Sequence, residues 1–245
     1  MSEILENKFL VIDERMRKIE KENLIKLGYN LIEVKQNMQV YPEISSHVDI
    51  FICKIGKKLI IEPSQYNQIK NQLQEIEKID KGIETIEKNY PQDIKYNVCI
   101  IGKKALHNFK YTEPKILEEL EKQGYELINT NQGYTNCSIA VIDDNSAIVT
   151  DKGLYKILKK HEIDVLFLNY EPDIKLLNCQ NEYSNKKGFI GGCISRIKNN
   201  IVIFGDLRKI DYNNQIKEFI KKRNLQIIDF EGLDVIDYGG ITIVN

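Results

Sequence analysis

Short segments of this chain recur along its length. LGYNLIEV at positions 27–34 is similar to QGYELINT at 123–130, and each follows a stretch rich in lysine and glutamate. Two longer passages begin at Tyr41-Pro42 and at Tyr90-Pro91, and both end in Ile-Gly-Lys-Lys. Repetition of this kind indicates supersecondary units that bury their apolar faces against one another, so it constrains the architecture more than any single residue does.

Five units can be written, each with a helix, a strand, a loop and then two strands joined by a tight turn. The predicted helices are 14–27, 66–79, 114–123, 153–161 and 213–223. The strands that follow them are 31–34, 82–87, 126–129, 164–168 and 225–229. The predicted hairpins are 47–53 with 58–61, 98–101 with 104–107, 138–142 with 147–150, and 193–197 with 201–204. In the first helix we expect Met16, Ile19, Leu24 and Leu27 in the core, with Gly28 ending the helix.

The fifth unit has one final strand, 241–244, where the others have two, and the chain begins with an unpaired predicted strand, 8–12. Pairing these two strands completes the fifth unit and closes a ring without free sheet edges. The alternative, a doubly wound α/β sheet, has about one strand per helix, whereas this sequence has about three. We therefore predict a single domain over residues 1–245, a closed five-unit pseudo-symmetric α/β propeller whose N-terminal strand completes the last unit.

The composition of the chain argues against nucleic acid, membranes and metal ions as its binding partners. The chain has 35 basic and 36 acidic residues and a net charge of −1, so no overall field favours nucleic acid or an anionic membrane. No apolar stretch reaches the ~20 residues that cross a bilayer, and the first residues do not resemble a signal peptide, so we expect a cytoplasmic protein. The five cysteines lack CxxC spacing and do not pair with the three histidines at zinc-ligand spacing. We therefore expect no disulfide, metal or cofactor.

The predicted ring resembles the pentein fold, the α/β propeller of the guanidine-modifying enzymes such as arginine deiminase, agmatine deiminase, dimethylarginine hydrolase and glycine amidinotransferase. His47-Val48-Asp49 resembles the His-x-Asp of that superfamily, which implies an acid–base role for His47 and a carboxylate, Asp49, that helps to hold a guanidinium. Asp237-Tyr238-Gly239-Gly240 resembles the glycine-rich approach to the family's nucleophilic cysteine, but Ile241 follows and no cysteine does. The chain also resembles an uncharacterised clostridial group of unknown function placed near this superfamily.

Pseudo-symmetry predicts which residues meet at the ring axis, because the loop before each hairpin should point toward it. That position carries His47 and Asp49 in one unit, Cys137 in another and Cys193 in a third. A thiolate that attacks a guanidinium or amidine carbon needs a nearby histidine or cation to lower its pKa. Cys137 and Cys193 are therefore the candidate nucleophiles, with His47 and Asp49 as their catalytic partners. The alternative is that both cysteines are small buried hydrophobic residues.

A second recurrent position lies where each hairpin meets the next helix. It carries Asp13, Glu62, His107, Asp151 and Asp206. The carboxylates there have two interpretations: they cap the following helices, or they form a negative funnel for a cationic ligand. We favour caps for most of them and expect Asp151 and Asp206 to serve the pocket. The candidate substrate-binding residues are Asp13, Glu62, Asp151, Asp206 and Asp237.

Three functions stay open. The first is a hydrolase or transferase that acts on a C–N bond of a guanidino or amidino compound through a cysteine. The second is a non-catalytic pentein-fold protein that binds a cationic small molecule or a protein partner. The third is a metal hydrolase in which His47, Asp49 and neighbouring carboxylates hold Mg²⁺ or Mn²⁺. The sequence favours the first, and the missing cysteine after Gly240 keeps the second open. A polar insertion, 171–187, is interpreted as a lid over the axis or as a surface loop.

Overall fold

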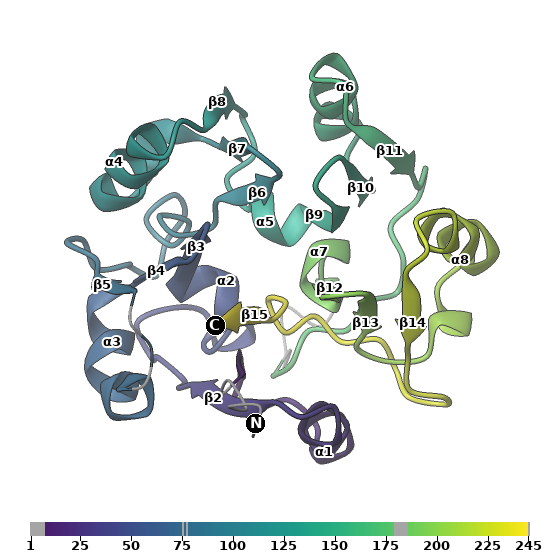
Figure 1. The fold of residues 1–245 in the computed structure, drawn as a ribbon, viewed down its shortest axis with the longest axis horizontal. Helices are drawn as coiled ribbons and strands as arrows, with labels where there is room; N and C mark the ends of the chain where they lie inside the picture. Colours follow the sequence, from purple (N-terminus) through teal and green to yellow (C-terminus); the bar gives the residue numbers. More distant parts are fainter. Residues whose placement is uncertain (1–7, 75, 77, 179–185, 245) are drawn as a thin grey trace, which may run out of the picture.

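The strands of this chain form five separate three-stranded sheets, which surround a central axis. The computed structural model describes residues 8–74, 76, 78–178 and 186–244 (Figure 1). Each sheet has an antiparallel pair of strands and a third strand that pairs in parallel with the middle one. A helix connects the middle strand to the third. The five-unit α/β propeller that the sequence predicts is therefore confirmed.

Four units are continuous in sequence, and each runs hairpin, helix, strand. They are β3 (Ile52–Ile55), β4 (Lys58–Ile61), α3 (Pro63–Ile69) and β5 (Ile79–Lys81); β6 (Cys99–Ile101), β7 (Lys104–His107), α4 (Pro114–Lys122) and β8 (Glu126–Asn129); β9 (Ile139–Asp143), β10 (Ser146–Val149), α6 (Lys152–Lys160) and β11 (Asp164–Phe167); and β12 (Ile194–Ile197), β13 (Asn200–Ile203), α8 (Asn213–Lys221) and β14 (Gln226–Ile228). Each helix therefore belongs to the same unit as the hairpin that precedes it. The units predicted from the sequence instead grouped each helix with the hairpin that follows it.

The fifth unit joins the two ends of the chain. It contains β15 (Thr242–Val244), β1 (Phe9–Asp13), α1 (Lys18–Lys26) and β2 (Asn30–Val34). β1 pairs antiparallel with β15, with Leu10 opposite Ile243, and in parallel with β2. The prediction that the first strand completes the last unit is confirmed, and this pairing brings the two ends of the chain into one sheet. The expectation that closure removes free sheet edges is wrong, because the five sheets of the described chain are separate and each keeps its edge strands.

The apolar core lies between units, because each cluster of buried side chains draws on neighbouring sheets. One cluster packs Ile142 and Ile148 of the β9–β10 hairpin against Ile203 of β13. Another packs Leu10 and Leu24 of the fifth unit against residues of the fourth. Burial of such a side chain stabilises the fold by roughly 1.5–3 kcal/mol. Because these clusters are shared between units, a single unit cannot bury its own apolar residues, and we expect the ring to fold as a whole.

Short helices precede three of the hairpins and lie near the axis in Figure 1. They are α2 (Val48–Phe51), α5 (Thr135–Ser138) and α7 (Ile190–Cys193). Strands were predicted to begin at His47, Ser138 and Cys193, and those starts are wrong because each chain segment first makes one helical turn. Further 3₁₀ turns lie in connections: η1 (Pro42–Ile44), η2 (Lys70–Leu73), η3 (Phe109–Tyr111) and η5 (Leu207–Lys209).

Two predicted elements are misplaced. The helix expected at 66–79 begins at Pro63, because the Glu62 side chain accepts hydrogen bonds from the first free amides. The parallel strand therefore arrives earlier, at β5, in place of 82–87. In α1, Ile19 is 55% exposed and Leu27 is 41% exposed, contrary to expectation. Among the described residues, no helix has the length and apolar character needed to span a membrane.

Candidate functional site

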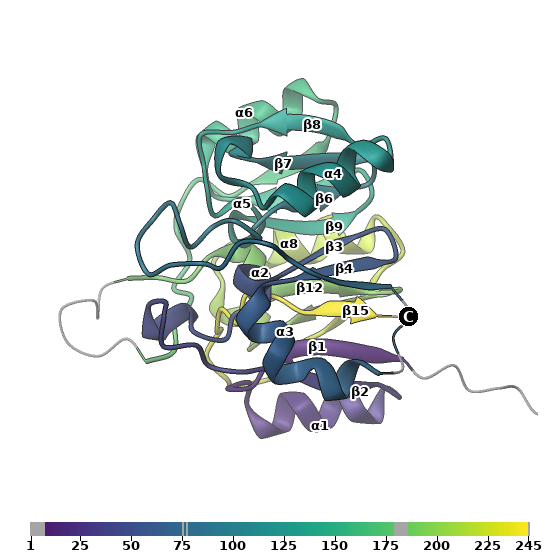
Figure 2. The same cartoon turned by 90° about the vertical axis from the view of Figure 1, so that its left-hand side faces the viewer.

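One end of the ring axis is built from the short helices and the loop that leads into β15. His47 is the N-cap of α2, Cys137 lies on α5, and Gly192 lies on α7. Backbone hydrogen bonds join these segments: the amide of Asp49 donates to Gly239, and the amide of Gly240 donates to Gly192. In Figure 2, α2 lies at one end of the strands and the C-terminus at the other. The three short helices and the loop before β15 thus bring residues from four units to one end of the axis.

The glycines of this region are required by close packing. Gly239 has a φ of +67°, and a Cβ built on it would lie 2.5 Å from the Cβ of His47 and 2.6 Å from Oδ1 of Asp49. A Cβ on Gly192 would overlap the carboxylate of Asp237. These two backbone segments therefore press directly on the acidic side chains, and only glycine fits there.

A cavity of about 660 Å³ opens at this end, which we call the axial cavity. Its buried floor consists of His47, Cys137, Ser138 and Asp237. Aromatic residues on its wall are Tyr41, Tyr134 and Phe189. Both sides of the predicted insertion contribute lining residues, which are Glu171, Pro172 and Leu176 on one side and Lys186, Lys187 and Gly188 on the other. Positions 179–185, with Cys179, fall outside the described residues. The site is a concave pocket of the size that small-molecule ligands occupy.

Asp237 is a buried carboxylate without a lysine or arginine partner among the described residues. It is 1% exposed, and it accepts hydrogen bonds from the amides of Phe189 at 2.8 Å and Gly239 at 2.9 Å. Its Oδ1 lies 3.7 Å from Nδ1 of His47. Burial lowers the pKa of His47, although Asp237 and Asp13 oppose this shift, so the imidazole is neutral at pH 7. Neither ring nitrogen of His47 makes a hydrogen bond within the described part of the chain.

Asp49 lies directly behind Cys137. The thiol of Cys137 donates to Oδ2 of Asp49 at 2.8 Å, while Oδ1 of Asp49 is buried without a hydrogen-bond partner among the described residues. Burial, and then the charge of Asp237, raise the pKa of Asp49 to about 8. At pH 7 this carboxyl group is therefore mostly protonated, and it exchanges its proton close to neutral pH.

The two candidate cysteines differ in position. Cys137 is on the floor of the axial cavity, whereas Cys193 is fully buried in the apolar cluster between the third and fourth units and donates to the carbonyl of Ile190. Burial raises the pKa of both thiols well above its ordinary value, and for Cys137 the carboxylates Asp49 and Asp237 raise it further. Neither thiol makes a hydrogen bond with His47, so the predicted activation of a cysteine by that imidazole is absent from this arrangement.

The recurrent carboxylates act mainly as caps. Glu62, Asp151 and Asp206 accept hydrogen bonds from the first amides of α3, α6 and η5, which confirms the cap interpretation for them. Asp13 instead holds Arg15, and this ion pair lowers the pKa of Asp13 although burial opposes the shift. His107 at this position bonds to Thr112 and Gly133, and burial lowers its pKa to about 4.

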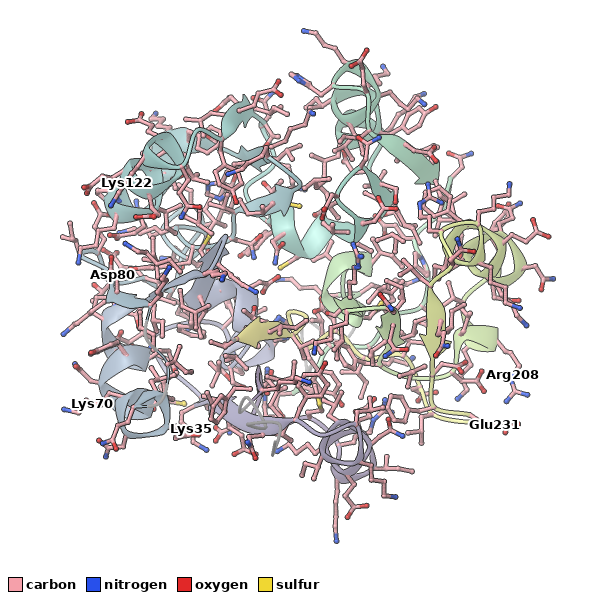
Figure 3. All side chains as sticks on the ribbon, viewed as in Figure 1. Lys35, Lys70, Asp80, Lys122, Arg208 and Glu231 are labelled. Atoms are coloured by element: carbon pink, nitrogen blue, oxygen red, sulfur yellow. The ribbon has the colours of Figure 1, made fainter. Side chains whose placement is uncertain are left out.

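Of these carboxylates only Asp151 lines the axial cavity, at its exposed rim. The expectation that Asp206 serves the pocket is corrected: its carboxylate pairs with Arg208, which lies with Glu231 at the periphery of the ring (Figure 3). The pairing with Arg208 lowers the pKa of Asp206. Asp13 and Glu62 also lie outside the cavity lining.

The main residue that the candidate set missed is Asn97. Its side-chain amide donates to the sulfur of Cys137 at 3.1 Å and to the carbonyl of Asp49 at 3.2 Å, while its carbonyl oxygen accepts from the amide of Asn136 at 2.8 Å. Asn97 occupies the position in the second unit that Asp49 occupies in the first. The pseudo-symmetry of the sequence could therefore have indicated that Asn97 belongs to the site. Asn97 fixes α5 against α2. Among the described residues, no group of three or more potential metal-ligating side chains is close enough to hold a metal ion.

Comparison with known proteins places the chain in a family. A model described as a family of unknown function (DUF6873) matches residues 11–242. No curated protein matches the chain.

Solved structures that resemble it are enzymes. DDAH from Pseudomonas aeruginosa, a mutant complexed with citrulline, has a TM-score of 0.54 at 10% identity over 93% of this chain and 91% of that chain. A dimethylarginine dimethylaminohydrolase adduct with 4-chloro-2-hydroxymethylpyridine has a TM-score of 0.56 at 12% identity over 93% and 92%. C. jejuni agmatine deiminase has a TM-score of 0.51 at 14% identity over 90% and 75%. At such identities the likeness shows the fold alone. The chain therefore belongs to the DUF6873 family, whose function is unknown, and it has the pentein fold shared with enzymes that modify guanidino groups.

Proposed function

We propose that this protein binds a small molecule with a guanidinium or amidinium group on the floor of the axial cavity, with Asp237 as the anion that holds it. The observation that carries the proposal is the buried Asp237 carboxylate, which has amide neighbours and the imidazole of His47 but no lysine or arginine partner among the described residues. A buried carboxylate without a cation is costly unless a partner compensates its charge. A cationic ligand would supply that charge.

The geometry favours a planar cation over a spherical one. A carboxylate offers about four lone-pair sites, and the two amides that contact Asp237 occupy two of them. The neutral imidazole of His47 offers one further acceptor nitrogen to a ligand, since neither of its ring nitrogens is hydrogen-bonded within the described chain. Guanidinium and amidinium groups present several N–H donors in one plane, and paired N–H···O bonds to a carboxylate are strong. Two of the structural relatives are a dimethylarginine dimethylaminohydrolase and an agmatine deiminase, and dimethylarginine and agmatine belong to the same chemical class.

The probe that tests this proposal is methylguanidine, with methylurea as its neutral counterpart of nearly the same shape. Millimolar methylguanidine should raise the melting temperature, because a ligand that binds only the folded state stabilises it. The shift should grow between pH 7 and pH 9, since Asp49 loses its proton near pH 8 and adds a negative charge beside the cation. Equal shifts from methylguanidine and methylurea would contradict the proposal.

A second candidate function is covalent chemistry at Cys137. The specific observation is the hydrogen bond from Cys137 to Asp49, whose raised pKa makes it a proton acceptor suited to neutral pH. The thiol proton would pass to Asp49 as sulfur forms a bond to the amidine carbon and the C=N electron pair moves to nitrogen. Asp49 would then give this proton to a second nitrogen on the same carbon; the C–N bond to that nitrogen breaks, the C=N bond re-forms, and an amine or ammonia leaves the amidine carbon bonded to Cys137. A cation on the floor would favour this transfer because it offsets the charges that raise the pKa of Cys137.

Labelling with a haloacetamidine separates the two functions. Covalent chemistry predicts that Cys137 is labelled at least about tenfold faster than the other cysteines, and that Asp49→Asn removes the difference. Mass spectrometry of the digested protein gives the rate at each site. Slow and uniform labelling, together with a methylguanidine-dependent melting shift, would leave the binding function and exclude the catalytic one.

A further inference from the structure

A second cavity lies on the ring axis, further along the innermost strands toward the hairpin turns, and we call it the turn-side cavity. Its volume is about 210 Å³. Lys54, Ile100, Val141 and Arg196 line it. Each pairs with the second residue of the strand that follows, so all four hold the same register position in their hairpins. The fold therefore points one position of every continuous hairpin at this cavity.

The charges around the turn-side cavity differ from those of the axial cavity. Lys54 and Arg196 are the charged residues that line it, and no carboxylate does so within the described part of the chain. The axial cavity, by contrast, has four carboxylates in its lining, Glu43, Asp151, Glu171 and Asp237, together with three lysines, Lys152, Lys186 and Lys187. Of these two cavities, carboxylates of the described residues therefore line only the axial cavity, and the charged side chains that line the turn-side cavity are both cationic.

Both cations retain free hydrogen-bonding capacity. The ammonium of Lys54 has no hydrogen bond or ion pair among the described residues, and burial lowers its pKa. Arg196 donates from Nε to the carbonyl of Lys198, while its Nη1 lies 3.9 Å from the highly exposed Asp144. Its terminal nitrogens therefore make no hydrogen bond within the described chain. A partly buried ammonium without a partner is unfavourable unless an anion approaches it.

We propose that the turn-side cavity binds a small oxyanion, inorganic phosphate or the phosphate or carboxylate group of a larger molecule, between Lys54 and Arg196. Arginine offers a planar fork that matches oxyanions, and lysine adds a point charge. β15 lies between the sheets of β3 and β12 in Figure 1, and its Thr242 adds a hydroxyl to the lining. The cavity has room for such an anion together with water.

This site is separate from the proposed cation site. Asn136, Gly191 and Gly239 line the turn-side cavity, and each is within two residues of a residue that lines the axial cavity. One layer of backbone therefore divides the two. The inference does not rest on the proposed function, and Asp49→Asn, which alters the dividing layer, should leave the phosphate response intact.

The test is a melting-temperature titration with potassium phosphate, compared with potassium chloride at equal ionic strength. Phosphate should raise the melting temperature of the wild-type protein more than chloride does. Lys54→Met and Arg196→Gln should each weaken the phosphate affinity at least about tenfold. Lys57→Met is the matched control, because Lys57 is an exposed lysine on the turn of the hairpin that contains Lys54. The phosphate affinity of this variant should equal that of the wild-type protein. Methyl phosphate and acetate as further probes distinguish a phosphate site from a carboxylate site.

A second readout does not depend on added phosphate. Lys54→Met should raise the melting temperature of the anion-free protein, because it replaces an unpartnered, partly buried ammonium with an apolar side chain of similar length. If Lys54→Met lowers this temperature and leaves the phosphate response unchanged, Lys54 is structural and the proposal is wrong. Equal effects of phosphate and chloride, or an equal loss of affinity in Lys57→Met, would also overturn it.

Discussion

Replacement of Gly239 by alanine should lower the free energy of unfolding by about 2–5 kcal/mol. Two effects add. The φ of +67° is a left-handed conformation that an alanine adopts at a cost of roughly 1–2 kcal/mol. The new methyl group would also press on His47 and Asp49, which are buried and cannot move aside without disturbing α2. Urea denaturation of both proteins measures the difference.

Gly28→Ala is the matched control. Gly28 has a similar conformation, with a φ of +87°, but a Cβ there meets nothing within 4 Å. Its replacement should lower the free energy of unfolding by only about 1–2 kcal/mol. The difference between the two variants isolates the crowding at the axis. Equal losses would mean that the loop before β15 is not packed against His47 and Asp49.

Asp237→Asn should weaken the binding of methylguanidine at least about 30-fold, which corresponds to about 2 kcal/mol. The substitution removes the negative charge next to the cation and replaces one acceptor oxygen with an NH₂ group. That group faces an amide of Phe189 or Gly239, so some loss of stability is also expected, and a melting curve verifies that the variant is folded. Calorimetric titration gives the affinity.

Asp151→Asn provides the comparison within the same cavity. Asp151 lines the rim, is exposed, and caps α6 through a bond from the amide of Leu154. Asparagine caps a helix about as well as aspartate, so stability should be unchanged. Exposed charges contribute little, so the affinity should fall less than about threefold. A larger effect at Asp151 than at Asp237 would place the cation at the rim and contradict the proposed floor site.

The overall ring could be predicted from the sequence because its signals are repeated and local. Four hairpins, five helices and a lone first strand are visible as periodic apolar segments with turns between them. The pairing of β1 with β15 follows from counting strands, since an unpaired edge is unfavourable. The short helices could not be predicted in this way. Four residues such as Val48–Phe51, all of them buried, are too few to show a helical period.

The site could be predicted only in outline. Pseudo-symmetry brought His47, Asp49 and Cys137 to one end of the axis, but it gave Cys193 the same standing. The structure separates them: Gly191 packs against the carbonyl of Cys137, where a Cβ would lie 2.6 Å from the oxygen, and Cys193 faces the apolar cluster between the third and fourth units. The sequence pattern also could not show that Asp151 lines the axial cavity and Asp206 does not. In the structure the Asp206 carboxylate is instead paired with Arg208.

The central claim is that the floor of the axial cavity holds a planar cation against Asp237. The most direct test is a crystal structure of the wild-type protein with methylguanidine. We expect planar density on the floor, with ligand nitrogens about 2.7–2.9 Å from the carboxylate of Asp237. Density for methylguanidine only outside the axial cavity, or a floor occupied by water at saturating ligand, would contradict the claim.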